Sequence, residues 1–326
     1  MDVIVPQFIA DEDYSATRAE LLESSVTATT EILYAVDTAY VTNNIVKYKP
    51  LAGNDQGTWR TYKALSSFTS DASATVENPY LTPTLWSDQG PTEQWKMFDF
   101  LALTATTDAS NDIEISLHCR AINSIAFMNV QASDITIIIY DGSDLADKIP
   151  ANLLDTITIE LTQQLSSWFE YFFDDFDYIR DVATPINIDL YQNVVLEITF
   201  SKITSQDCYC GQCLPGRSYF LGNLQYGVST GIDDYSKKDT NDFGYTYLNQ
   251  GNYKKTMDCD LTIENTTLNT VNSILTQLRS IPTVWQANPD DVAYDNLLVY
   301  GFFKDFNIVM PYPSYSECSL QIEGLI

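Results

Sequence analysis

The sequence has very little histidine and few basic residues, and both shortages restrict what the protein can do. His118 is the only histidine among 326 residues, so the side chain that most often serves as a general base is nearly absent. Lysine and arginine together number 17 against 44 aspartates and glutamates, a formal net charge of -27 at pH 7. Such a negative field repels a phosphate backbone, and no basic cluster offsets it. We therefore expect no sequence-specific binding of nucleic acid.

The chain also lacks several motifs of common catalytic and cofactor sites. It contains no H-E-x-x-H, no P-loop and no G-x-G-x-x-G motif. A cysteine stands beside a histidine only at His118-Cys119, and in a strand two neighbouring side chains point to opposite faces. Because no set of residues is identified that would carry a reaction, we expect a protein that is not an enzyme and that holds no cofactor.

Long apolar runs are missing as well. No stretch approaches the roughly 18 apolar residues that a membrane-spanning helix requires, so we expect no membrane span. The opening residues MDVIVPQFIADEDYS contain no basic region followed by an apolar one, so we expect no secretory signal and synthesis in a cytoplasm. Hydrophobic residues nevertheless make up 45% and aromatic residues 13%, enough to build folded cores. A length of 326 residues indicates two or three domains.

Short runs rich in β-branched residues dominate the middle of the chain. Asn, Asp, Gly and Pro separate these runs, which lie at residues 112–119, 123–130, 134–141, 156–162, 186–191 and 193–200. Strands at this density without intervening helices favour a β-sandwich rather than an alternating α/β sheet. We assign the sandwich to residues 91–228 and expect a jelly roll of the galactose-binding type.

The last hundred residues combine strands with one helix. Apolar residues recur at helical spacing within residues 265–282, at Leu268, Val271, Leu275 and Leu278. Runs typical of strands precede and follow this segment. Residues 229–326 are therefore predicted to form an α+β assembly domain in which one helix packs on an antiparallel sheet.

The first ninety residues divide into two parts. Residues 14–31 tolerate a helix, so we expect residues 1–31 to form an N-terminal arm with a short helix. Residues 32–90 are rich in turns and aromatic residues, with strands expected within 39–49 and 58–65. This part is predicted to be a small aromatic β module, and the fold class of the whole chain is mainly β.

The stretch LWSDQGPTEQWKMFDF, residues 85–100, shows neither helical nor strand periodicity. Gly90-Pro91 breaks both kinds of element, and Trp86 and Trp95 stand on either side of it. Because exposed tryptophans are costly, we expect Trp86 to close the core of the aromatic module and Trp95 to open the core of the sandwich. The segment is predicted to be a rigid elbow between the two.

Three cysteines lie close together, at Cys208, Cys210 and Cys213. They could bind one metal ion with a fourth ligand from elsewhere, form disulfides after release from a reducing cytoplasm, or pack in a core as free thiols. The residues considered as a fourth ligand are His118, Cys119, Cys259 and Cys318. A structural zinc site usually pairs two cysteine knuckles and only one is present, so packing is the favoured interpretation. We expect the three cysteines on a loop near one rim of the sandwich.

An acidic and aromatic segment, WFEYFFDDFDYIRD, occupies residues 168–181. Asp174, Asp175 and Asp177 offer carboxylates for Ca²⁺, but their spacing matches no EF-hand loop. Acidic residues number 44, so paired carboxylates alone do not indicate glycoside hydrolysis. The favoured interpretation is an aromatic plug under a long loop, made by Trp168, Phe169, Phe172, Phe173 and Phe176.

Several segments are distinctive in combination: LLESSV, AYVTNNIVKYK, TWRTYKAL, LWSDQGPTEQWKMFD, GVSTGIDDYSKKDTNDFG and VYGFFKDFNIVMPYPSYSECSLQIEGL. Together, from about Leu21 to Leu325, they resemble a family of structural proteins of tailed bacteriophages and prophages. The resemblance implies a virion component made in the bacterial host cytoplasm, whose partners are copies of itself and other tail or head-tail proteins. Residues 34–90 are also similar to small chitin-binding-type carbohydrate modules, from which they depart by longer inserts at 49–58 and 68–79.

Two functions from different classes follow. The first is a structural protein of the tail, collar or baseplate that works by self-association. The second is a carbohydrate-binding module for host adhesion, with host surface glycans as partner and with Tyr40, Tyr48, Trp59 and Tyr62 lining an open face. A unit of about sixty residues needs those aromatic side chains for its own core, which favours the first function. We expect the contacts on the C-terminal sheet and on the tyrosine-rich segment 235–253.

Overall fold

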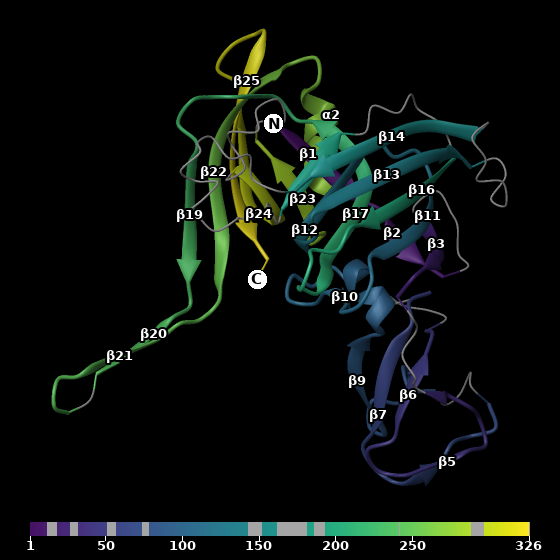
Figure 1. The fold of residues 1–326 in the computed structure, drawn as a ribbon. Helices are drawn as coiled ribbons and strands as arrows, with labels where there is room; N and C mark the ends of the chain where they lie inside the picture. The colour runs from purple at the N-terminus through teal and green to yellow at the C-terminus, as the bar shows by residue number, and fades with distance from the viewer. Residues whose placement is uncertain are drawn as a thin grey trace.

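The computed structural model describes residues 1–11, 18–26, 32–50, 57–73, 78–142, 152–161, 181–185, 193–240, 242–287 and 297–325. Regular structure in these residues is almost entirely β, which confirms the expected fold class. Figure 1 shows a β-sandwich, a curled sheet beside it, a small lobe below it and a long two-stranded arm. No helix in the described residues is long and apolar enough to cross a membrane.

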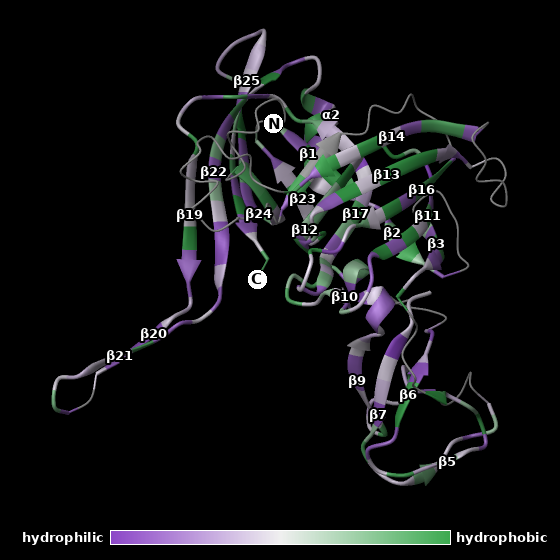
Figure 2. Cartoon of the chain, viewed as in Figure 1, coloured by the Kyte–Doolittle hydropathy of each residue, from purple (hydrophilic) through white to green (hydrophobic). Residues whose placement is uncertain are grey.

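The front layer of the sandwich is a six-stranded sheet. Its strand order is β14 (Leu153–Glu160), β13 (Asp134–Asp141), β16 (Val194–Phe200), β11 (Ile113–Cys119), β3 (Arg18–Ser24) and β2 (Phe8–Ala10). Along β13 the side chains of Ile135, Ile137 and Ile139 are fully buried, whereas those between them are partly exposed. This period of two in burial packs one face of the sheet against the back layer, and Figure 2 shows hydrophobic segments along β13 and β14.

The back layer belongs to a sheet that continues beyond the sandwich. Its order is β15 (Val182–Pro185), β12 (Ser124–Gln131), β17 (Cys208–Phe220), β1 (Asp2–Pro6), β23 (Thr283–Gln286), β24 (Leu298–Val309), β25 (Tyr315–Gly324), β22 (Tyr253–Glu264) and β18 (Asn223–Leu224). In addition, β10 (Thr106–Asp108) pairs with β17 and β19 (Ser229–Asp234) with β22. Residues 91–228 and 229–326, expected as separate domains, therefore share one sheet. The link is β1, which pairs with both β17 and β23 and whose Val3 and Ile4 are buried.

The C-terminal part of this sheet carries the predicted helix. The helix α2 (Leu268–Gln277) and the residue after it bury Val271, Leu275 and Leu278 against the strands around Trp285. The helical spacing of these residues is thus explained by one apolar face on a sheet. The expected arrangement of one helix on an antiparallel sheet is confirmed.

The N-terminal residues differ from the prediction. Residues 1–31 were expected to carry a short helix, but residues 18–24 form strand β3, which pairs with β11 and β2. Ala19 and Leu21 of this strand are buried in the sandwich core. Alternate burial against a neighbouring sheet strand outweighs the weak helix propensity of so short a segment.

The small lobe is built from short strands around aromatic side chains. A four-stranded sheet has the order β4 (Ile32–Leu33), β6 (Ile45–Tyr48), β7 (Arg60–Ala64) and β9 (Trp86–Pro91). A separate pair joins β5 (Ala39–Tyr40) to β8 (Phe68–Thr69). The buried core contains Tyr34, Tyr40, Val46, Tyr62, Ala64 and Trp86. The lobe therefore has a core of its own, as expected for residues 32–90.

The arm is a β-ribbon that leaves the curled sheet. β19 and β22 run side by side and continue into a hairpin of β20 (Lys237–Thr240) and β21 (Thr246–Asn249). In Figure 1 this ribbon points away from both the sandwich and the lobe. Every side chain of β20 and β21 is exposed.

Candidate functional site

The predicted elbow is regular structure rather than an irregular corner. Residues 86–91 form strand β9 and Glu93–Phe98 form the 3-10 helix η1. Gly90 is accommodated by a β-bulge in which Thr61 pairs with Gly90 and Tyr62 with Asp88, and the φ of Gly90 is +98°. Pro91 is tolerated because β9 is the edge strand of its sheet.

The two tryptophans lie in different cores. The ring of Trp86 is 5.0 Å from that of Tyr40 and 5.4 Å from that of Phe68, inside the lobe. The ring of Trp95 is 5.9 Å from that of Phe98, and both side chains are buried in the sandwich core. The segment between them spans the junction of lobe and sandwich.

A second connection holds the lobe to the sandwich. The carboxylate of Asp11, which follows β2, accepts a hydrogen bond from the indole N–H of Trp59 at 2.8 Å. The same oxygen lies 2.9 Å from the ammonium of Lys49. The backbone N–H of Asp11 also donates to the carbonyl of Gly57 at 2.8 Å. Two segments of the lobe are therefore attached to the front sheet independently of the 86–95 segment.

The four aromatic residues predicted for sugar binding do not form an open platform. Tyr40 and Tyr62 are buried in the core of the lobe. Tyr48 packs against the same core, with its ring 5.7 Å from that of Tyr34, and burial raises the pKa of Tyr48. Trp59 packs against the sandwich core instead. Tyr40, Tyr48 and Tyr62 therefore contribute to the packing of the lobe and Trp59 to its contact with the sandwich, and the buried rings of Tyr40 and Tyr62 present no stacking face for a sugar.

The cysteine cluster lies in a strand and not in a loop at the rim. Cys208, Cys210 and Cys213 belong to β17, and all are buried in the sandwich core. Cys213 lies three positions after Cys210, an odd offset that would place the two side chains on opposite faces of a regular strand. Asn129 on β12, with φ of +52°, interrupts the alternation beside Gly211, where a Cβ would meet Asn129 Cβ at 2.9 Å. This irregularity turns both thiols inward.

Burial disfavours the thiolate form of each cysteine in this cluster. Burial raises the pKa of Cys208 to about 11 and raises the pKa values of Cys210 and Cys213 well above the ordinary value for a thiol. The pKa of Cys119, in the same core, is raised by burial as well. All four are free cysteines. Packing in the core, the interpretation favoured from the sequence, agrees with this geometry.

The other residues considered as metal ligands lie apart from the cluster. Cys259 and Cys318 are free thiols buried in the C-terminal core. His118 is on β11, with Nδ1 3.7 Å from a carboxylate oxygen of Glu20, and burial lowers its pKa. Across the described part of the chain, no group of three or more His, Cys, Asp or Glu side chains is arranged to hold a metal ion. Asp174, Asp175, Asp177 and the aromatic residues proposed as a plug lie outside the described residues.

One G-x-S-x-G spacing is present, at residues 227–231, and motif reasoning did not single it out. In α/β-hydrolases this motif forms a sharp turn between a strand and a helix. Here Ser229 opens the exposed strand β19 and pairs with Asp258 of β22. His118, the only histidine, lies on the front sheet of the sandwich, so Ser229 has no histidine base beside it.

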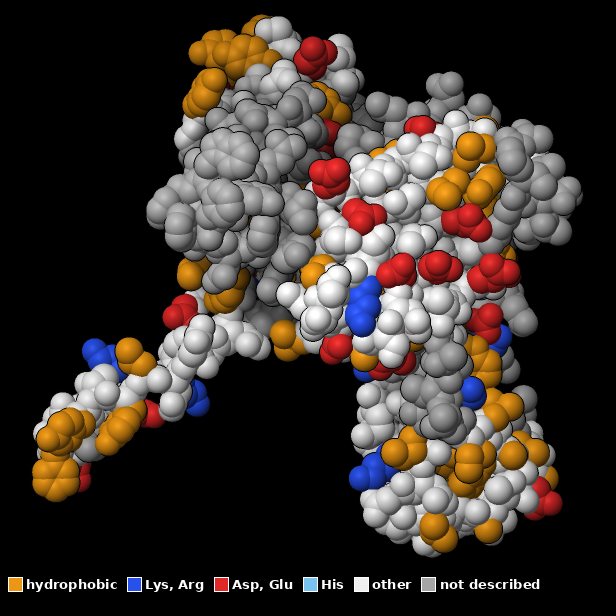
Figure 3. Space-filling view, in the orientation of Figure 1, with side chains coloured by type: hydrophobic (Ala, Val, Ile, Leu, Met, Phe, Trp, Pro, Cys, Tyr) orange, Lys and Arg blue, Asp and Glu red, His pale blue; other side chains and the backbone are white. Residues whose placement is uncertain are grey.

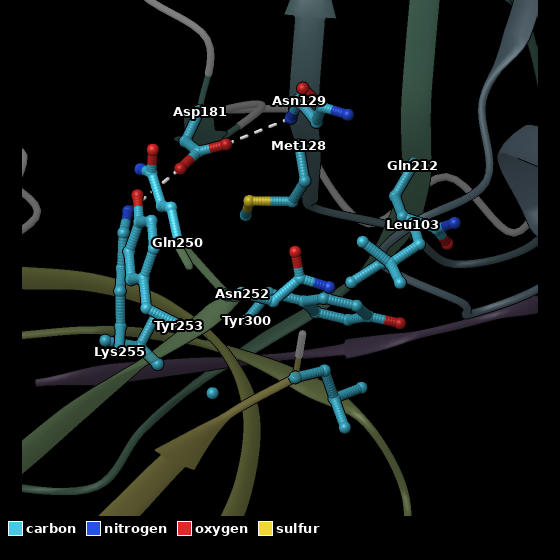
Figure 4. Close-up of a pocket in the computed structure, with 15 residues that line it drawn as sticks. Leu103, Met128, Asn129, Asp181, Gln212, Gln250, Asn252, Tyr253, Lys255 and Tyr300 are labelled. Atoms are coloured by element: carbon cyan, nitrogen blue, oxygen red, sulfur yellow. Dashed lines mark hydrogen bonds and ion pairs between the residues drawn. The ribbon is translucent and has the colours of Figure 1, made fainter. Parts of the chain in front are cut away.

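A cavity of about 580 Å³ lies where the curled sheet, the sandwich and the base of the arm meet. Figure 4 shows Asp181 at its upper side, where the carboxylate accepts a hydrogen bond from the backbone N–H of Asn129 and pairs with Lys255, both at 2.9 Å. Met128 and Tyr300 supply apolar surface. The Asp181–Lys255 pair is thus satisfied within the cavity wall, beside apolar surface from Met128 and Tyr300.

The outer face of the front sheet has a second hollow, of about 530 Å³. Three glutamates from neighbouring strands line it, Glu23 on β3, Glu114 on β11 and Glu197 on β16. Figure 3 shows acidic side chains over this side of the sandwich, whereas the arm shows hydrophobic, basic and acidic side chains together. Sequence reasoning did not identify the hollow, because its residues come together only through the pairing of the strands.

Comparison with known proteins gives no family. No protein-family model matches the chain, and no curated protein matches it.

Proposed function

We propose that the protein is a structural subunit that works by self-association, and that it is a component of a bacteriophage particle in the tail, collar or baseplate. One structural observation carries the self-association: an exposed β-ribbon arm with large apolar side chains. The resemblance of the sequence to tailed-phage structural proteins supports the placement in a virion. The chain turns over no substrate in this proposal.

The arm is unsuited to an isolated monomer. Beyond the curled sheet, β20 and β21 pair only with each other among the described residues. A two-stranded hairpin without further packing is at best marginally stable in water, and both of its edges offer unpaired backbone groups. Such a ribbon gains stability when another surface covers it.

The side chains of the arm point to the same conclusion. Phe243 is 86% exposed and Leu248 76%, and Tyr245 and Tyr247 are exposed beside them. Burying each of these side chains in a contact would contribute about 1.5–3 kcal/mol. Four of them together give on the order of 6–12 kcal/mol, within the range of the 4–15 kcal/mol that association costs in lost freedom. Burial of these side chains can therefore provide most of the apolar free energy of an association contact, and polar groups then fix the orientation of the arm in that contact.

Self-association is tested by removing the arm. A variant in which residues 237–249 are replaced by two glycines keeps the base of the ribbon, where Tyr235 N–H donates to the carbonyl of Asn252 at 3.0 Å. We expect the full chain to form multimers in light scattering and the shortened chain to be monomeric with unchanged circular dichroism. A full chain that stays monomeric over the accessible concentration range would exclude self-association.

The virion placement is tested on particles. Mass spectrometry of purified phage should detect the protein, with a copy number that is a small multiple of six or twelve for a position on the tail axis. A few copies per fibre would favour host adhesion instead, and absence from particles would exclude a virion component.

A further inference from the structure

The hollow on the front sheet is organised around one serine. Ser116, at the middle of β11, is 3% exposed, and its hydroxyl has no hydrogen-bond partner among the described residues. The strand register places Glu197 directly opposite it on β16 and Glu23 directly opposite it on β3. Glu114 lies two residues away on the same strand and therefore on the same face. The three glutamates thus line the same hollow as the buried hydroxyl.

This arrangement fits an ammonium group. An unpaired hydroxyl in a buried position costs stability unless a ligand supplies a hydrogen bond. A lysine ammonium offers three donors and a positive charge, which suit the serine oxygen and the glutamates together. Ile138 and Ile198 also line the hollow, so the ligand should bring an apolar group beside its charge.

The arm of this protein carries that combination on one face. Lys238 pairs directly with Leu248, and Thr240 with Thr246, so these four side chains share a face of the ribbon. The opposite face contains Asp239. The Lys238 face is thus free of acidic residues within β20 and β21, and it is the face that complements three glutamates.

We infer that the Lys238–Leu248 face of the arm docks in the Ser116 hollow of a second copy of this chain. The Lys238 ammonium lies at the Ser116 hydroxyl among the glutamates, and Leu248 covers Ile138. This inference rests on the proposed self-association and names its contact. Because the arm points away from the sandwich of its own chain, the contact joins two different surfaces of two copies (Figure 1). Such a head-to-tail contact closes into a ring or continues into a filament.

The experiment compares two neighbouring lysines in the full chain. Lys238→Glu is expected to raise the dissociation constant of self-association by about tenfold or more, since a like charge then faces the glutamates. Lys237→Glu is the matched control, because it makes the same change of charge on the opposite face. We expect it to change the dissociation constant by less than about threefold. Light scattering measures the association, and circular dichroism checks the fold of each variant.

Exchanging the charges of the two proposed contact sites gives the decisive part of the test. Glu114→Lys in the hollow is expected to weaken self-association as Lys238→Glu does, and the double variant is expected to recover it to within about threefold. Equal effects of the two lysine substitutions, or no recovery in the double variant, would overturn this contact while leaving self-association in place. A full chain that never associates would overturn both proposals together.

Discussion

Replacing Trp86 by alanine is expected to unfold the small lobe and leave the sandwich folded. The indole is 1% exposed and makes ring contacts with Tyr34, Tyr40 and Phe68 at 5.0–6.0 Å. Truncating a buried tryptophan to alanine costs about 3–5 kcal/mol. A unit of roughly sixty residues has a total stability of about 3–9 kcal/mol, taking 0.05–0.15 kcal/mol per residue. The loss is therefore comparable with the whole stability of the lobe.

Trp95→Ala is the matched variant on the sandwich side. It removes the same atoms from a side chain that is also 1% exposed, so its local cost is again about 3–5 kcal/mol. The sandwich core is larger and is continuous with the sheet that reaches the C-terminal strands. We expect a lower midpoint for the main unfolding transition and an intact lobe. Trp86→Phe serves as a milder control, because it keeps a ring and removes an indole N–H for which the described residues supply no hydrogen-bond acceptor.

Limited proteolysis and calorimetry distinguish the two variants. Trp86→Ala should be cleaved rapidly within residues 68–79 and yield a stable fragment that contains the sandwich and the C-terminal strands. Trp95→Ala should resist cleavage there at the same temperature. If both substitutions lowered one common transition by the same amount and no stable fragment appeared, the two cores would not be separate and the reasoning would be wrong.

Three further outcomes are expected. Asp11→Ala leaves the Lys49 ammonium and the Trp59 indole N–H without their shared carboxylate, so we expect a loss of about 1–3 kcal/mol in urea unfolding; an unchanged midpoint would contradict a role for this connection. Burial raises the pKa of Asp99, so the folded chain holds this proton more tightly than the unfolded chain. The free energy of unfolding should then fall as the pH rises from the usual aspartate pKa near 3.9 through the raised pKa of the folded state. Asp99→Asn should remove this fall, and parallel stability curves against pH for the two proteins would refute the prediction. The six thiols are buried, so Ellman's reagent should label them only as the protein unfolds, and rapid labelling of the native protein would show that they are accessible.

The sequence predicted those elements whose burial follows a simple period. The strands at residues 112–119, 123–130, 134–141 and 193–200 were located because apolar side chains face one core, and the helix near residues 265–282 because its apolar residues share one stripe. The strand predicted at residues 186–191 lies outside the described residues.

Elements without such a period were missed. β1 is a central strand buried on both faces, so its DVIVP sequence shows no alternation. β17 contains glycine, proline and three cysteines, a composition typical of a loop, and its alternation changes at Gly211. Residues 86–91 were expected to interrupt any strand, yet an edge position and a bulge accommodate Gly90-Pro91. In each case the tertiary neighbour decides the conformation, and a single sequence does not identify that neighbour.

The Ser116 hollow could not be predicted for the same reason. Glu23, Glu114 and Glu197 are far apart in the sequence and converge only when β3, β11 and β16 pair in one register. A shift of one residue in the register of a strand would turn all of its side chains to the other face and disperse the set. Among 44 acidic residues, no local signal marks these three.

The distribution of charge explains why assembly would use the arm rather than other surfaces. A net charge of -27 makes two copies repel each other in most orientations. Residues 235–253 contain two lysines and two aspartates, so the arm is locally neutral and approaches an acidic surface without this penalty. In the proposed assembly, repulsion elsewhere excludes unspecific contacts, while the Lys238 face meets its complement in the hollow. Added salt screens both effects, so the specific contact should weaken while unspecific association becomes easier. The acidic body would therefore be a source of specificity for the contact proposed for the arm.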